Sequence, residues 1–152
     1  DPTIPVKTKE EAIILASIVE KETSLVSERP KVASVFINRL RKSMKLQSDP
    51  TIIYSFTFGD TSLERVIRMS DIQNSSAFNT YHIYGLPPAP ICNPGIAAIK
   101  AVLNPIENEF IFFVASGHGD HIFSSSLKEH NANVAKYRKL MRKKEQEKLM
   151  VE

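Results

Sequence analysis

One apolar run without a charge, from Ala12 to Val19, constrains this chain more than any other stretch. It follows Thr8-Lys9-Glu10-Glu11, a capping-box pattern whose hydroxyl and carboxylate satisfy the backbone donors at a helix start. A helix that is apolar on nearly every side is usually buried, because no face suits water. The run is far shorter than the roughly 20 residues that a membrane span needs. The sequence therefore predicts a helix in the middle of a domain.

The size and charge of the chain limit its class. Its 152 residues, 42% of them hydrophobic, suffice for one core and indicate a single domain over residues 1–152. A single cysteine excludes an internal disulfide and a cysteine-cluster metal site. Residues 136–152 are basic, as in some nucleic-acid binders, but Glu145 and Glu147 interrupt the bases as on a solvated helix. We therefore expect no nucleic-acid partner.

Local signals predict about five helices and one hairpin. Cap and proline patterns place the starts of the later helices at Ser27, Pro50, Asn93-Pro94 and Ser126. Aromatic and β-branched residues from Phe110 to Ala115 predict a strand, which returns at Ile122-Phe123. Residues 56–94 are irregular and proline-rich, and such a segment inside a domain is more often a binding loop than filler. The expected fold is a mostly helical α+β domain.

Two glutamates end the first predicted helix. Glu22 shares a helix face with Ile14 and Ile18, because residues four apart lie above one another. Apolar neighbours disfavour the charged carboxylate, and a neutral carboxylic acid can donate a proton in catalysis. Glu20 shares its face with Ala16, so the spacing favours Glu22 only slightly. The alternative is that both acids lie at the solvated end of a buried helix.

Two further groups invite a chemical interpretation. His118, Asp120 and His121 lie on a glycine-rich turn, without the spacing of a helical ligand pair or an obvious fourth ligand. Turn chemistry explains them as well. Cys92 follows His82 by ten residues, but such a pair is no nucleophile without geometry, and a packed thiol is the simpler interpretation. We predict neither a metal site nor a cofactor.

Six blocks occur in order along the chain: LASIVEKET at 15–23, VASVFINRL at 32–40, LQSDPT at 46–51, FNTY at 78–81, GLPP at 85–88, and FVASG at 113–117 with His121 to Phe123. Together they resemble the catalytic region of the endolytic murein transglycosylases, the YceG-like family, over residues 11–138. Phe78 replaces the family's usual tyrosine, and Ile91-Cys92 its usual small residues. Both departures lie outside the glutamate motif. The resemblance implies a lysozyme-like catalytic groove.

The resemblance also implies an activity. Such an enzyme cleaves the β-1,4 bond between N-acetylmuramic acid and N-acetylglucosamine in peptidoglycan glycan strands, leaves 1,6-anhydro ends, and controls glycan length during wall synthesis. One glutamate of the motif would be catalytic. We place it on Glu22, with Glu20 as the alternative, because Glu22-Thr23 resembles the Glu-Ser pair of other lytic transglycosylases. A non-catalytic peptidoglycan-binding module and a lysozyme-type hydrolase stay open as alternatives.

Three loop residues in the matching blocks, Gln47, Asp49 and Tyr81, are the expected substrate contacts. Asp49 is also expected to cap the helix that begins at Pro50.

The resemblance finally implies a location. It describes a bacterial inner-membrane protein with one N-terminal anchor and a periplasmic catalytic part. The chain begins at Asp1 without a methionine, so we expect it to be the C-terminal part of a longer protein. The anchor and a wall-binding-like subdomain would then lie outside it. Peptidoglycan synthases are the expected protein partners.

Overall fold

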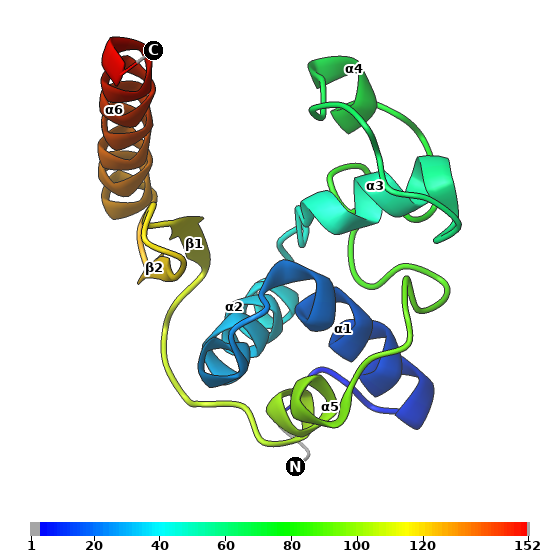
Figure 1. The fold of residues 1–152 in the computed structure, drawn as a ribbon. Helices are drawn as coiled ribbons and strands as arrows, with labels where there is room; N and C mark the ends of the chain where they lie inside the picture. The colour runs from blue at the N-terminus through cyan, green and yellow to red at the C-terminus, as the bar shows by residue number, and fades with distance from the viewer. Residues whose placement is uncertain (1–3, 152) are drawn as a thin grey trace. The chain divides into compact units, whose positions relative to one another are not determined.

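A computed structural model describes residues 4–151 (Figure 1). The residues up to Glu107 form one compact unit and those from Asn108 onward a second, and each is described by itself. Helices dominate the described residues, and a two-stranded antiparallel sheet accompanies them, which confirms the mostly helical α+β class. The single domain over residues 1–152 stays a prediction.

The first unit is helical. In chain order it contains α1 (Lys9–Glu22), the short 3₁₀ helix η1 (Val26–Glu28), α2 (Arg29–Arg41), α3 (Asp49–Thr57), α4 (Met69–Ile72) and α5 (Ile96–Leu103). Helix α1 packs against α2, α3 and α5 (Figure 1). Leu15 and Ile18 on α1 are fully buried. The buried central helix predicted from the apolar run is therefore confirmed.

The first turn of α1 follows the predicted capping pattern in part. The Thr8 hydroxyl accepts a hydrogen bond of 3.1 Å from the Glu11 N–H. The Glu11 carboxylate accepts from the N–H of Lys7, at 2.7 Å, rather than from that of Thr8. The first contact satisfies a backbone donor of the first turn, and the second ties the residue before the N-cap to that turn.

Two helices begin later than their local signals predict. Helix α2 begins at Arg29 rather than after Ser27, because Ser27 lies inside η1. Pro30 lies in the first turn of α2, as the sequence predicts. Helix α5 begins at Ile96 rather than at Asn93-Pro94, with Gly95 as its N-cap residue. Each signal is within three residues of a real helix start, as is usual for boundaries read from local sequence.

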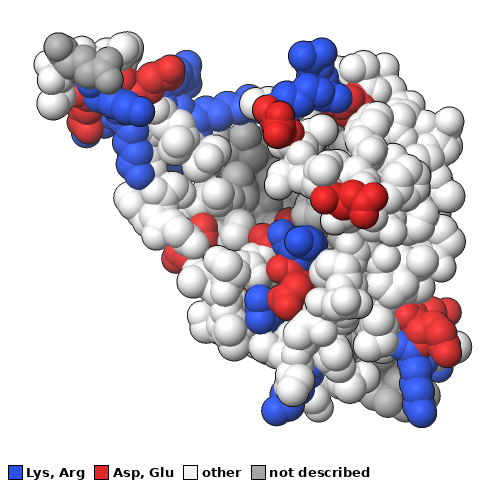
Figure 2. Space-filling model, turned by 45° about the vertical axis from the view of Figure 1, so that its right-hand side comes forward, with Lys and Arg blue, Asp and Glu red and all other residues white. Residues whose placement is uncertain are grey.

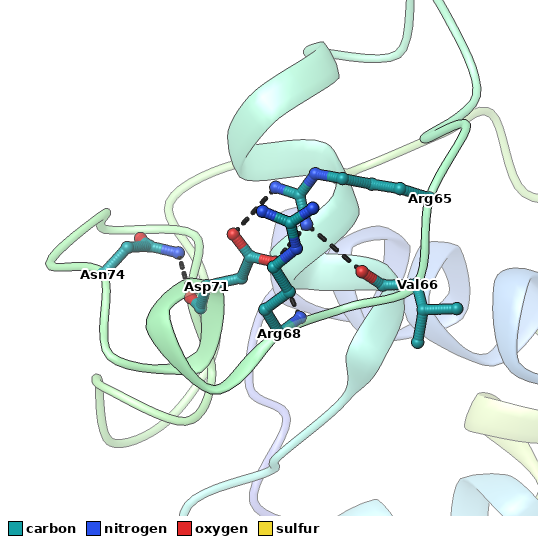
Figure 3. Close-up of polar contacts among 5 residues, drawn as sticks. All are labelled: Arg65, Val66, Arg68, Asp71 and Asn74. Atoms are coloured by element: carbon teal, nitrogen blue, oxygen red, sulfur yellow. Dashed lines mark hydrogen bonds and ion pairs between the residues drawn. The ribbon is translucent and has the colours of Figure 1, made fainter.

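The irregular segment between α3 and α5 contains α4, which the sequence analysis missed. Asp71 accepts hydrogen bonds from Arg65 Nη1 at 2.6 Å, from Arg65 Nη2 at 2.9 Å and from the Arg68 N–H at 2.8 Å (Figure 3). The Arg65 guanidinium, helped by the Arg68 N–H, lowers the pKa of Asp71 from 3.8 to about 2. The buried Asn79 amide donates to the carbonyl oxygens of Ile72 and Asn74. Polar side chains thus fix a loop that has no apolar periodicity.

The second unit is a hairpin followed by a long helix. Strands β1 (Phe112–Ala115) and β2 (His121–Ser124) pair antiparallel, with Phe113 opposite Phe123, so the predicted hairpin is confirmed. Gly117 in the turn has φ +88°, and a Cβ there would lie 2.5 Å from Leu140 Cδ2. Glycine therefore meets both a backbone and a packing requirement at this position.

Helix α6 (Leu127–Val151) packs against both strands of the hairpin. The Ser126 hydroxyl accepts from the Glu129 N–H at 3.2 Å, as its capping-box pattern predicts. The helix buries none of its described side chains, and Lys143 Nζ lies 4.0 Å from Glu147 Oε1. Figure 2 shows one face of the molecule, on which the Lys and Arg side chains lie among Asp and Glu side chains. Among the described helices, none is both long and apolar enough to cross a bilayer.

Candidate active site

Glu22 is the last residue of α1, and its half-buried carboxylate meets the start of α3. Its Oε1 accepts a hydrogen bond of 2.5 Å from Ser48 Oγ. Ser48 is the N-cap residue of α3 and is only 1% exposed, yet its hydroxyl does not cap its own helix. The Ser48 hydroxyl instead donates to the Glu22 carboxylate, so the start of α3 orients the last side chain of α1.

Two buried threonines hold Ser48 in place. The Ser48 N–H donates to Thr80 Oγ1 at 2.8 Å, and Thr80 Oγ1 lies 2.8 Å from Thr51 Oγ1. Thr51 Oγ1 donates in turn to the Ser48 carbonyl oxygen at 2.6 Å. All three residues are at most 1% exposed. Because satisfied buried networks are rigid, the donor to Glu22 has a fixed position.

Asp49 and Tyr81 form a second contact beside this network. Tyr81 Oη donates a hydrogen bond of 2.6 Å to Asp49 Oδ1. Burial first, and then the bond to Asp49 and the charges of Asp49 and Glu22, raise the pKa of Tyr81, so its phenol stays protonated as a donor. The cap predicted for Asp49 is wrong: Asp49 is the first residue of α3, and its carboxylate is engaged by Tyr81 rather than by the helix.

Gln47 is exposed at the rim of the same network. Its N–H donates to the Thr80 carbonyl oxygen at 3.2 Å, and its backbone adopts a left-handed conformation with φ +52°. Such strained non-glycine residues are common at functional sites. Arg39 Nη1 on α2 donates to the Lys45 carbonyl oxygen at 2.9 Å and to Gln47 Oε1 at 3.5 Å. Burial lowers the pKa of Arg39, while Tyr81 nearby opposes that shift.

Glu20 lies two residues away and has a different environment. Its Oε2 forms an ion pair of 2.5 Å with Arg29 Nη2, and its Oε1 accepts from the Gly95 N–H at 2.9 Å. These contacts hold α1 to the starts of α2 and α5. A carboxylate at a helix N-terminus is also favoured by the helix dipole. Both oxygens of Glu20 therefore hold structure together.

The structure thus gathers Glu22, Gln47, Asp49 and Tyr81 around one network and gives Glu20 a separate place. The sequence analysis missed the residues that connect the first group, namely Arg39, Ser48, Thr51 and Thr80. The blocks 46–51 and 78–81 contain three of these four residues. No periodicity pairs these blocks, because the contacts join positions 29 to 32 residues apart.

The other candidate groups do not assemble into sites. Within residues 4–151, no three His, Cys, Asp or Glu side chains gather as metal ligands. Asp120 Oδ1 accepts from Ser116 Oγ, and the His118 N–H donates to the same hydroxyl, as turn residues do. Cys92 Sγ donates to the Ser17 carbonyl oxygen at 3.3 Å, and burial raises the pKa of its thiol. A raised pKa leaves less of the thiolate form, which is the nucleophilic one.

A cleft of about 1030 Å³ has residues of both α1 and α3 in its wall. Its wall consists of Lys21 from α1, residues of α3 and of the chain that follows it, and residues 90–93. Lys21 precedes Glu22, and Pro50 on the wall follows Asp49. Two wall residues are thus sequence neighbours of Glu22 and Asp49, which are not themselves among the described residues of the wall.

Comparisons with known proteins identify the family of the chain. The model of the YceG-like family matches residues 3–136. A Bacillus subtilis protein named endolytic murein transglycosylase is 39% identical over 125 residues, which cover 82% of this chain and 34% of that protein. A Streptococcus pneumoniae protein of the same name is 33% identical over 133 residues, covering 86% and 24%.

The fold of the chain also resembles that of a solved structure. A yceG-like protein from Listeria monocytogenes matches with a TM-score of 0.74 and 37% identity, over 81% of this chain and 39% of that one. The chain spans about a third of the Bacillus relative and about a quarter of the Streptococcus relative. On the family match and these identities, this chain belongs to the YceG-like family.

Proposed function

We propose that this chain carries the catalytic region of an endolytic murein transglycosylase, with Glu22 as its acid and base. One observation carries the assignment to Glu22: its half-buried carboxylate accepts a hydrogen bond from the buried Ser48 hydroxyl, whereas Glu20 is committed to Arg29 and Gly95. The names of the Bacillus and Streptococcus relatives support the reaction class.

One carboxylate suffices for this reaction. A two-carboxylate glycosidase needs its second group as nucleophile or to activate water. Here Glu22 first protonates the glycosidic oxygen that leaves, and then accepts the proton of the C6 hydroxyl of the same N-acetylmuramic acid. That hydroxyl attacks C1 and closes the 1,6-anhydro ring. An intramolecular nucleophile already has a high effective concentration, so the enzyme mainly orients the sugar.

Gln47, Asp49 and Tyr81 are the proposed contacts to the sugar in that step. The exposed Gln47 amide can donate and accept, and the Tyr81–Asp49 pair presents a protonated phenol beside a carboxylate. Such groups suit a ligand made of hydroxyl and amide groups. In the cell we propose a periplasmic role in limiting glycan length, through a membrane anchor outside this chain and beside peptidoglycan synthases.

Mass spectrometry of the products from purified glycan strands tests the proposal. The protein should release fragments with 1,6-anhydro ends, and Glu22→Gln should lower the rate by about 10²–10⁴-fold, the usual effect of losing a general acid. Glu20→Gln, assayed below its unfolding temperature, serves as the control and should cleave at a rate close to that of the unmodified protein.

Each of the other outcomes would lead to a different conclusion about the function or the catalytic residue. Reducing ends would indicate a lysozyme-type hydrolase. Binding to strands without cleavage would indicate a binding module. An inactive Glu20→Gln with an active Glu22→Gln would move the catalytic role to Glu20.

A further inference from the structure

Helix α6 has one side that packs and one side that does not. A Cβ at Gly117 of the hairpin turn would lie 2.5 Å from Leu140 Cδ2 and 3.9 Å from Tyr137 Cδ2. Lys144 Nζ donates a hydrogen bond of 2.7 Å to the Gly117 carbonyl oxygen. Tyr137, Leu140 and Lys144 follow one another at steps of three and four residues, so they share one side of the helix. That side faces the hairpin.

Four exposed bases lie on another side of α6, namely Arg138, Lys139, Arg142 and Lys143. Steps of three and four residues connect them, so they form one continuous surface, which we call the basic face. Lys143 lies 4.0 Å from Glu147 Oε1, and an exposed pair of this kind contributes little. The basic face is therefore available to an anionic partner.

The charge of the chain is concentrated on this helix. Residues 127–151 contain eight bases and three acids, which gives +5, whereas the whole chain carries only +3. The remaining residues therefore carry −2. A uniformly basic protein attracts any anionic surface from all sides, but here the attraction comes from one helix.

Two exposed apolar side chains continue the basic face. Leu149 is 68% exposed and follows Arg142 by seven residues, and Met150 is 87% exposed and follows Lys143 by seven. Residues seven apart lie on the same side of a helix. Lysine and arginine can keep their charges in a polar layer while neighbouring apolar groups enter a less polar one. The face thus combines positive charges with an apolar end.

We propose that the basic face of α6 binds the surface of a membrane that contains anionic phospholipids. Such a surface has a layer of negative phosphates for the bases and, directly below it, an apolar layer for Leu149 and Met150. A nucleic acid or another polyanion in solution matches the bases but has no such layer beside its phosphates. The helix lies flat on the lipid and does not cross it. The inference goes beyond the proposed cleavage, because no residue of the basic face belongs to the network around Glu22.

Sedimentation with lipid vesicles tests the contribution of the bases. The protein should bind vesicles of equal parts phosphatidylglycerol and phosphatidylcholine, and should stay in solution with vesicles of phosphatidylcholine alone. The triple variant Arg138→Gln/Lys139→Gln/Arg142→Gln should lower the partition coefficient by about 100-fold, because each base near an anionic surface contributes about fivefold.

A second triple variant is the matched control. Lys9→Gln/Lys42→Gln/Lys100→Gln removes the same charge from exposed positions of the first unit. Its partition coefficient should stay close to that of the unmodified protein. Equal losses in the two triple variants would show that net charge and not the basic face attracts the vesicles, and the inference would be wrong.

A fluorescent reporter separates a lipid from a polyanion in solution. The chain has no tryptophan, so Leu149→Trp introduces a single one. Its emission should move to shorter wavelengths on phosphatidylglycerol vesicles, whereas that of Leu103→Trp, from a leucine 57% exposed on α5, should not move. No binding to these vesicles would overturn the inference. Equally strong binding to a soluble DNA duplex, with no change in the Leu149→Trp emission on vesicles, would also overturn it.

Discussion

Ser48 Oγ lies 2.5 Å from Glu22 Oε1, across 26 residues of sequence. The bond joins the last residue of α1 to the N-cap of α3, and Thr80 and Thr51 fix its donor. A general acid must present its proton at one point, so a carboxylate held by a rigid hydroxyl is well suited to the role. Ser48 acts through Glu22 and is a positioning residue.

Ser48→Ala should lower kcat by roughly 10- to 150-fold and leave KM nearly unchanged, because a lost hydrogen bond to a charged group costs roughly 1.5–3 kcal/mol. Steady-state kinetics on glycan strands measure the two parameters separately. Ser55→Ala is the matched control, since the Ser55 hydroxyl donates to the Thr51 carbonyl oxygen within α3 and not to Glu22. Equal losses in both variants would show that Ser48 matters to the helix and not to Glu22.

Glu20 and Gly95 should act on stability together. A Cβ at Gly95 would lie 2.9 Å from Glu20 Oε1, so Gly95→Ala should displace the carboxylate and lower the free energy of unfolding by about 1 kcal/mol. Glu20→Gln should lower it by about 1.5–3 kcal/mol, because Arg29 loses its ion-pair partner. Urea titration of both single variants and the double variant measures the coupling. Since both changes disturb one contact, the double variant should lose less than the sum.

Tyr81 should make the fold sensitive to alkali. The pKa of Tyr81 is raised in the folded protein, whereas a phenol in the unfolded chain ionises near pH 10. The unfolded state therefore loses its proton first, and stability falls as pH rises above about 10. Denaturant titrations between pH 9 and 11.5 should show a steeper loss in the unmodified protein than in Tyr81→Phe. Parallel pH profiles would place the phenol outside this linkage.

Asp71 should respond to acid. Its pKa is lowered to about 2 in the folded protein, so its contribution is present above its ordinary value of 3.8 and is lost as pH falls toward 2. Asp71→Asn should lower the Tm at pH 7, and the difference from the unmodified protein should shrink between pH 4 and pH 2. Arg65→Ala should behave like Asp71→Asn. Arg68→Ala should have a smaller effect, because Asp71 accepts a hydrogen bond from the backbone N–H of Arg68, which alanine keeps.

Part of the fold was predictable because its signals are local. An apolar run after a capping box predicts α1, and alternating aromatic residues around a glycine-rich turn predict the hairpin. Helix starts were less accurate, since the start of α5 depends on Glu20, which lies 75 residues away in the sequence and bonds to the Gly95 N–H. The short helix α4 was missed because polar contacts of Asp71, and no apolar pattern, stabilise it.

The sequence by itself determined the family, the glutamate motif and the buried helix that carries the motif. Only the tertiary structure gave Glu20 and Glu22 different surroundings. Helical spacing separates them by a part of a turn, which says which face each side chain occupies but not what meets that face. Arg29 and Gly95 meet one, and Ser48 meets the other, through contacts that span up to 75 residues. Such contacts exist only after the chain has folded, because they are made between elements that local sequence does not pair.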